Sequence, residues 1–326
     1  MAAAQGGPGR DLRRCIWFAL FMALPAPDDS SRPPEWFLAA IATPAKQAAV
    51  EVDGASIAYR TYGDREDRGI VLVHGGAAHA HWWDHIAPLL AVDHMVVALD
   101  LSGHGDSGRR EAYGLDMWAQ EVLAVVADAG ITAPPTVIGH SMGGLVTLRA
   151  ASLHGPRVAG AVAVDSPVRD ITPEERAARE QRAFGPLRVY PTAEAAIARF
   201  HPIPDQPTLP YVAAHVAQTS IRPVDGGWSW KFDPRIFARH QLPPALLTRL
   251  DCRVALFRAE HGIVSQQMSD MMYDRLGRLA PVIEIPAAAH HVMLDYPIAL
   301  VTGIRTLLSD WDHSTPAAPG EPGEPG

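Results

Sequence analysis

Six short apolar runs recur along the middle of the chain, and each is continuous rather than alternating with polar residues. Such runs are typical of strands that are buried on both faces of a parallel sheet. Stretches with helical periodicity separate most of them, and this alternation predicts a doubly wound, mostly parallel α/β sheet. The runs span residues 70–73, 95–99, 136–138, 158–164, 254–257 and 282–285, and the main helices are expected at 115–129, 142–153, 266–279 and 298–311.

Residues 50–60 alternate around Asp53-Gly54, which predicts a hairpin before the first of these runs. The segment 166–244 has no convincing strand run, many prolines and several helical pieces, and it is too long for a loop in a compact domain. We therefore expect an α/β core of residues 36–165 and 245–313, with residues 166–244 forming a helical cap. Aromatic residues of this cap could line an apolar pocket or pack against the core. They are Tyr190, Phe200, Trp228, Trp230, Phe232 and Phe237.

The two ends differ from the rest of the chain. Residues 1–35 form an extension in which Arg10, Arg13 and Arg14 precede an apolar run at 15–26, a pattern that resembles a secretory signal. Asp11 within the basic part counts against this interpretation. A cytoplasmic location is expected, with secretion as the alternative if residues 10–26 act as a signal peptide. Residues 314–326 are rich in Pro, Gly and Glu and are predicted to be a disordered tail.

Composition excludes several classes of function. The formal charge is -8 and the arginines are scattered, which argues against nucleic acid as a partner. No apolar run approaches the roughly 18–20 residues of a membrane span. The only cysteines are Cys15 and Cys252, so a disulfide scaffold and a cysteine-based metal site are both excluded.

The sharpest motif is Gly139-His140-Ser141-Met142-Gly143, which follows the run 136–138 and precedes an expected helix. This is the strand-helix context of a G-x-S-x-G nucleophile elbow. Ligands of open α/β sheets bind beyond the carboxyl ends of the strands, where this turn would lie. The tight turn lifts the Ser141 hydroxyl clear of the backbone, so the motif predicts Ser141 as a nucleophile.

A second glycine-rich loop, His74-Gly75-Gly76-Ala77, follows the run 70–73. Backbone N–H groups in such a loop can point at a substrate oxygen, as an oxyanion hole requires. The expected donors are the N–H groups of Gly76 and Met142.

Together these stretches resemble the α/β-hydrolase family over about residues 50–312. The family's turn after the next strand appears as residues 100–107, and its C-terminal histidine, followed seven positions later by a proline, appears as His290 and Pro297. Ser141 needs a base within hydrogen-bond reach. The spacing to Pro297 favours His290, with His291 as the alternative. The resemblance implies that no metal or other cofactor is needed. His79, His81 and His85 are interpreted as a solvated or aromatic-packed helix start rather than a metal site.

The acid of the triad is where the chain departs from the family pattern. The resemblance implies an aspartate after the strand 254–257, but the chain has Arg258-Ala259-Glu260-His261-Gly262 there. Two candidates remain, and both keep the chain order Ser, acid, His. Asp165 ends the strand 158–164, a position that some relatives use, and it is favoured over Glu260.

The resulting prediction is a serine hydrolase, a carboxylesterase that cleaves small to medium esters through an acyl-enzyme, with a small-molecule ester as its partner. Serine at the elbow counts against epoxide hydrolases and dehalogenases, which resemble this chain but use aspartate there. Carbon–carbon bond hydrolases, lactonases and perhydrolases remain open, as does a non-catalytic ligand-binding protein on the hydrolase scaffold.

Overall fold

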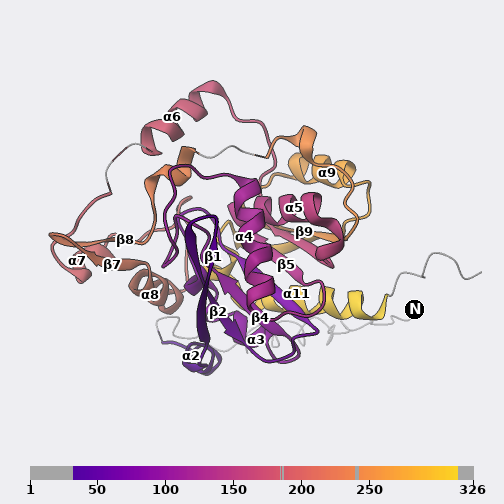
Figure 1. Cartoon of the computed structure of the whole chain (residues 1–326), viewed down its shortest axis with the longest axis horizontal. Coiled ribbons are helices and arrows are strands. Elements are labelled where there is room, and N and C mark those ends of the chain that lie inside the picture. The colour runs from indigo at the N-terminus through magenta and orange to yellow at the C-terminus, as the bar shows by residue number, and fades with distance from the viewer. Residues whose placement is uncertain (1–31, 184, 186, 239–241, 315–326) are drawn as a thin grey trace, which may run out of the picture.

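The computed structural model describes residues 32–183, 185, 187–238 and 242–314 (Figure 1). The possible signal segment at 10–26 lies outside these residues, as does all of the expected tail except Ser314. Within this part of the chain, no helix is both long and apolar enough to pass through a lipid bilayer.

An eight-stranded sheet forms the centre of the molecule, in the order β1-β2-β4-β3-β5-β6-β9-β10. The hairpin strands β1 and β2 are antiparallel to each other and β2 is antiparallel to β4, whereas all other neighbours are parallel. This confirms the predicted doubly wound, mostly parallel sheet. The strands are β1 (Lys46–Val52), β2 (Ala55–Tyr62), β3 (Gly69–Val73), β4 (Met95–Leu99), β5 (Thr136–His140), β6 (Gly160–Val164), β9 (Arg253–His261) and β10 (Val282–Ala289).

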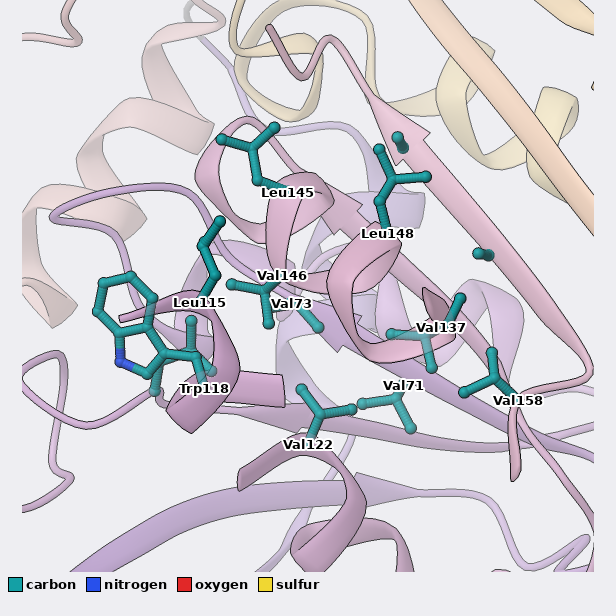
Figure 2. Packing of buried hydrophobic residues seen from close by; sticks show 14 of the residues in the cluster. Val71, Val73, Leu115, Trp118, Val122, Val137, Leu145, Val146, Leu148 and Val158 are labelled. Atoms are coloured by element: carbon teal, nitrogen blue, oxygen red, sulfur yellow. The ribbon is translucent and has the colours of Figure 1, made fainter. Parts of the chain in front are cut away.

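Alternate side chains of the central strands supply two cores, one on each face of the sheet. Every residue of β3, β4 and β6 is buried, which explains why these strands are continuously apolar. Val71 and Val73 belong to one cluster (Figure 2), whereas Ile70 and Leu72 belong to the other. Helices α4 (Leu115–Asp128), α5 (Met142–His154) and α9 (Gln266–Arg275) pack into the first cluster. The second contains residues of α2 (Glu35–Ala42), η1 (Ala80–Trp83), α3 (Ala87–Leu90), α10 (Val292–Asp295) and α11 (Pro297–His313).

The segment 166–244 lies outside this sheet, and the expectation that it contains no strand is wrong. Besides its helices it has a two-stranded antiparallel sheet of β7 (Ile221–Val224) and β8 (Gly227–Trp230). Gly226 adopts a φ of 83° in the connecting turn, a conformation that glycine adopts readily. The strands have four residues each and β7 contains Pro223, so neither gives a recognisable strand pattern. The other elements are α6 (Pro173–Ala183), α7 (Ala193–Ile197), α8 (Pro210–Thr219), η3 (Pro234–Ala238) and η4 (Pro244–Leu246).

Candidate active site

Ser141 lies in the sharp turn between β5 and α5. Its φ of 53° is in the left-handed region, and its N–H donates to the Val164 carbonyl at 2.9 Å. A Cβ added at Gly139 would overlap the backbone of Gly143, and one added at Gly143 would overlap that of Val73. The turn therefore excludes side chains at both glycine positions of the motif, which is the physical reason for its G-x-S-x-G pattern.

Three side chains from three carboxyl-terminal strand ends meet at this turn. His290 Nε2 lies 3.1 Å from Ser141 Oγ, and His290 Nδ1 lies 2.7 Å from Asp165 Oδ2. Asp165 directly follows β6 and is fully buried, while His290 directly follows β10 and is 3% exposed. When the Nδ1–H of a neutral His290 donates to Asp165, the Nε2 lone pair faces the Ser141 hydroxyl. This arrangement allows His290 to take the proton of Ser141.

The Asp165 carboxylate is held by the end of β9 and by the loop that follows it. The N–H of Ile263 donates to Oδ2 at 2.8 Å, and the N–H of Ala259 donates to Oδ1 at 3.3 Å. These contacts orient the carboxylate so that one oxygen still reaches His290. Asp165 itself has a φ of 42°, a conformation that aspartate adopts more readily than most residues.

The alternative acid, Glu260, lies elsewhere. The strand β9 continues to His261, so Glu260 is part of an extended strand rather than of the loop where it was expected. Its side chain is exposed, and Oε2 accepts the N–H of Ala287 on β10 at 2.7 Å. The structure therefore brings Asp165 to His290. It places Glu260 in a hydrogen bond between β9 and β10.

Two neutral imidazoles flank His290. The rings of His140 and His291 lie with their centroids 4.7 Å and 4.6 Å from that of His290. His140 donates from Nε2 to the His290 carbonyl at 2.9 Å, and His291 donates from Nε2 to the Ile203 carbonyl at 3.0 Å. Burial lowers the pKa of His291 to about 3 and holds the pKa of His140 well below its usual range. Neither ring competes for the proton, and the Nε2 of His291 faces the cap rather than Ser141.

The other histidines considered in the sequence are dispersed among separate hydrogen bonds. His79 contacts Ser220 Oγ at 2.8 Å, His81 contacts Asp84 at 2.7 Å, and His85 donates to the Met293 carbonyl at 2.8 Å. Among the described residues, the set of three that could share a metal ion is instead His140, His290 and His291. One ring nitrogen from each of these residues lies within 4.8 Å of the other two. Both ring nitrogens of His290 are already engaged by Asp165 and Ser141, so this set fits acid–base chemistry better than metal binding.

Ser141 and His290 line a cavity of about 1280 Å³ between the cap and the sheet edge. Gly76 and Met142, the expected oxyanion donors, line it beside them. Among the hydrogen bonds of the described residues, none uses the N–H of Gly76, which leaves this donor for a ligand. Five of the six cap aromatics noted in the sequence also line the cavity, namely Tyr190, Phe200, Trp230, Phe232 and Phe237.

A residue that the sequence did not single out joins the cap to the histidine loop. Gln206 Oε1 accepts the N–H of His291 at 2.8 Å, and its Nε2 donates to the His291 carbonyl at 3.3 Å and to Asp295 Oδ2 at 3.1 Å. Burial raises the pKa of Asp295 to about 6, against the opposing effect of backbone donors such as Ala289. No local motif marks Gln206, because its partners lie far away in the sequence.

Comparison with known proteins identifies the family of the chain. A family model described as the alpha/beta hydrolase family matches residues 70–303. Esterase Rv0045c of Mycobacterium tuberculosis (strain ATCC 25618 / H37Rv) is 26% identical over 246 residues, which cover 73% of this chain and 82% of the relative. The pimeloyl-[acyl-carrier protein] methyl ester esterase of Klebsiella pneumoniae (strain 342) is 39% identical over 102 residues, but this match covers only 31% of this chain and 37% of the relative.

Solved structures agree on the fold. E-2-(acetamidomethylene)succinate hydrolase superimposes with a TM-score of 0.70 at 21% identity, covering 81% of this chain and 99% of the other. The thioesterase domain from the curacin biosynthetic pathway gives a TM-score of 0.68 at 20% identity, covering 80% and 99%. Since the family model matches most of the described residues, this chain belongs to the alpha/beta hydrolase family.

Proposed function

We propose that this protein is a serine carboxylesterase that hydrolyses small to medium esters through an acyl-enzyme on Ser141. The observation that carries the proposal is the hydrogen-bonded series from Asp165 through His290 to Ser141 at the wall of a large cavity. The two sequence relatives described above point the same way, because both are named esterases.

In the first half of the reaction, Ser141 Oγ attacks the ester carbonyl carbon while His290 Nε2 takes the hydroxyl proton. The imidazolium that forms is stabilised by Asp165, which also holds the ring in the required tautomer. The N–H groups of Gly76 and Met142 donate to the oxyanion of the tetrahedral intermediate. His290 then gives its proton to the alcohol oxygen as the carbon–oxygen bond breaks, leaving an acyl-enzyme.

In the second half, His290 takes a proton from a water molecule whose oxygen attacks the acyl carbonyl. The new tetrahedral intermediate collapses, the bond to Ser141 Oγ breaks, and the proton returns to this oxygen. The acid product leaves and the free enzyme is restored. The neutral rings of His140 and His291 exclude water from the side of His290 and add no charge that would oppose the imidazolium.

Labelling with a fluorophosphonate tests the nucleophile. We expect one covalent adduct on the native protein, located at Ser141 by peptide mass spectrometry, and no adduct on Ser141→Ala. Equal labelling of both proteins contradicts the assignment of Ser141. If neither the native protein nor Ser141→Ala is labelled, the non-catalytic ligand-binding alternative is favoured.

A panel of p-nitrophenyl esters with acyl chains of increasing length tests the reaction class. We expect turnover that depends on Ser141, with kcat/KM rising until the acyl chain fills the cavity and falling afterwards. A protein that is labelled at Ser141 but turns over no ester of the panel contradicts the carboxylesterase proposal. Such a result would favour the lactonase and carbon–carbon bond hydrolase alternatives.

A further inference from the structure

The charges around the cavity are distributed unevenly. The chain as a whole has 36 acidic and 28 basic residues. Among the described residues that line the cavity there are nevertheless three arginines and no aspartate or glutamate. A cavity that served only neutral esters would not need this asymmetry, so the arginines call for a separate explanation.

One of the three arginines already has a carboxylate partner. Arg169 forms a bidentate ion pair with Glu175, with Nη1 2.7 Å from Oε2 and Nη2 2.9 Å from Oε1. The other two, Arg188 and Arg199, make no ion pair with any residue in the described ranges. Both side chains are exposed, which places them at the solvent side of the cavity, on the cap.

The backbone at both arginines is fixed by the cap. The Arg188 carbonyl accepts the hydroxyl of Ser229 on β8 at 2.9 Å, and its guanidinium carbon lies 5.3 Å from the centre of the Tyr190 ring. The Arg199 N–H donates to the Ala196 carbonyl at 2.9 Å, and its own carbonyl accepts from His201 Nδ1 at 3.0 Å. Each charge is thus carried by a stretch of chain whose backbone is held by hydrogen bonds within the cap.

From this distribution we infer that the substrate is an ester that carries an anionic group, which Arg188 and Arg199 bind at the cap while Ser141 attacks the ester carbonyl. The inference rests on the proposed esterase function and adds the class of substrate. Arginine suits the role because its planar guanidinium donates two parallel hydrogen bonds to a carboxylate or a phosphate. Aromatic side chains such as Phe200 and Trp230 line the same cavity, which suits an apolar linker between the ester and the anion.

The decisive experiment compares esters that differ only in charge at the far end. On the acyl side, the mono-p-nitrophenyl esters of adipate and suberate are compared with the same compounds capped as methyl esters. On the alcohol side, 4-acetoxybenzoate is compared with its methyl ester. We expect the charged member of at least one series to have a kcat/KM about tenfold higher at low salt, the size of one charge-assisted contact.

Two variants connect this preference to the arginines. In Arg188→Gln/Arg199→Gln the preference, taken as the ratio of kcat/KM between the charged and the neutral ester of each pair, should fall below about threefold. Arg176→Gln removes an exposed cap arginine that does not line the cavity, so it should keep the full preference. The preference of the native protein should also shrink as ionic strength rises, because the two arginines are exposed.

A binding measurement separates failure of this inference from failure of the proposed function. Calorimetric titration of Ser141→Ala with suberate and with its dimethyl ester reports anion binding without any turnover. Binding of suberate that weakens about tenfold in the double arginine variant supports the inference even if no ester is hydrolysed. The inference is overturned if neutral esters are hydrolysed without a charge preference in either series and if suberate binds equally to Ser141→Ala and to the double arginine variant. The esterase proposal would still stand.

Discussion

Gly262 lies directly against the carboxylate of Asp165. A Cβ at position 262 would come within 2.5 Å of Asp165 Cγ and closer still to both of its oxygens. The N–H of the following residue, Ile263, donates to the same carboxylate. The loop after β9, where the family resemblance implies an acid, therefore supplies backbone contacts here, and the proposed acid Asp165 lies at the end of β6.

Gly262→Ala should consequently impair the reaction without touching any reacting atom. The added methyl group must push Asp165 away from His290, and a displacement of about 1 Å at a catalytic group costs on the order of a hundredfold in rate. We expect kcat for p-nitrophenyl acetate to fall by about that factor. Gly114→Ala is the matched control, because a Cβ there meets nothing within 4 Å. Unchanged kcat in Gly262→Ala would mean that the position of Asp165 is unimportant for turnover.

Substitution of the two candidate acids distinguishes them directly. Asn fits the φ of 42° at position 165 but cannot hold the tautomer of His290 that presents a lone pair to Ser141. Asp165→Asn should therefore lower kcat by about four orders of magnitude, as in other triads. Glu260→Gln should leave kcat within about twofold, since exposed substitutions away from a site have small effects. The reverse pattern in steady-state kinetics would assign the acid to Glu260.

The sequence predicted most where the determinant is local. The turn around Ser141 needs glycines at fixed offsets, so its motif is legible in a few neighbouring residues. The central strands are buried on both faces, and their apolar runs reflect this directly. Both classes of feature follow from interactions within a short stretch of chain.

The remaining features depend on contacts between distant segments. Asp165 was only favoured over Glu260, because the end of β9 depends on its pairing with β10 and not on its own residues. Gln206 and Gly262 left no pattern, since their partners lie 85 or more positions away in the sequence. The hairpin of β7 and β8 was missed because its strands are short and are stabilised by contacts such as the pairing of Tyr190 with Trp228.

Gln206 offers a test of how the cap supports the histidine loop. Gln206→Ala removes the acceptor of the His291 N–H and two donors, so the backbone next to His290 loses its tie to the cap. We expect kcat to fall about tenfold, because the base is held less well, with a smaller change in KM. Gln218→Ala, an exposed glutamine on α8, is the control and should behave like the native protein. A change confined to KM would instead place Gln206 in substrate binding.

Buried neutral histidines should make the fold sensitive to mild acid. Burial lowers the pKa of His74 and of His85 to about 4. The unfolded chain binds a proton at each site as the pH falls below about 6.5, whereas the native state resists protonation until about pH 4. Stability that is fully present above pH 6.5 is therefore lost on acidification, by about 2 kcal/mol per histidine at pH 5.

His85→Gln isolates one of these contributions. A glutamine amide can still donate to the Met293 carbonyl, as His85 Nε2 does, but it cannot be protonated in this range. In urea unfolding at pH 7 and pH 5, the variant should lose about 2 kcal/mol less than the native protein between the two conditions, with an unchanged m-value. An identical loss in both proteins would show that His85 is protonated as readily in the folded state as in the unfolded one, and hence that burial does not lower its pKa.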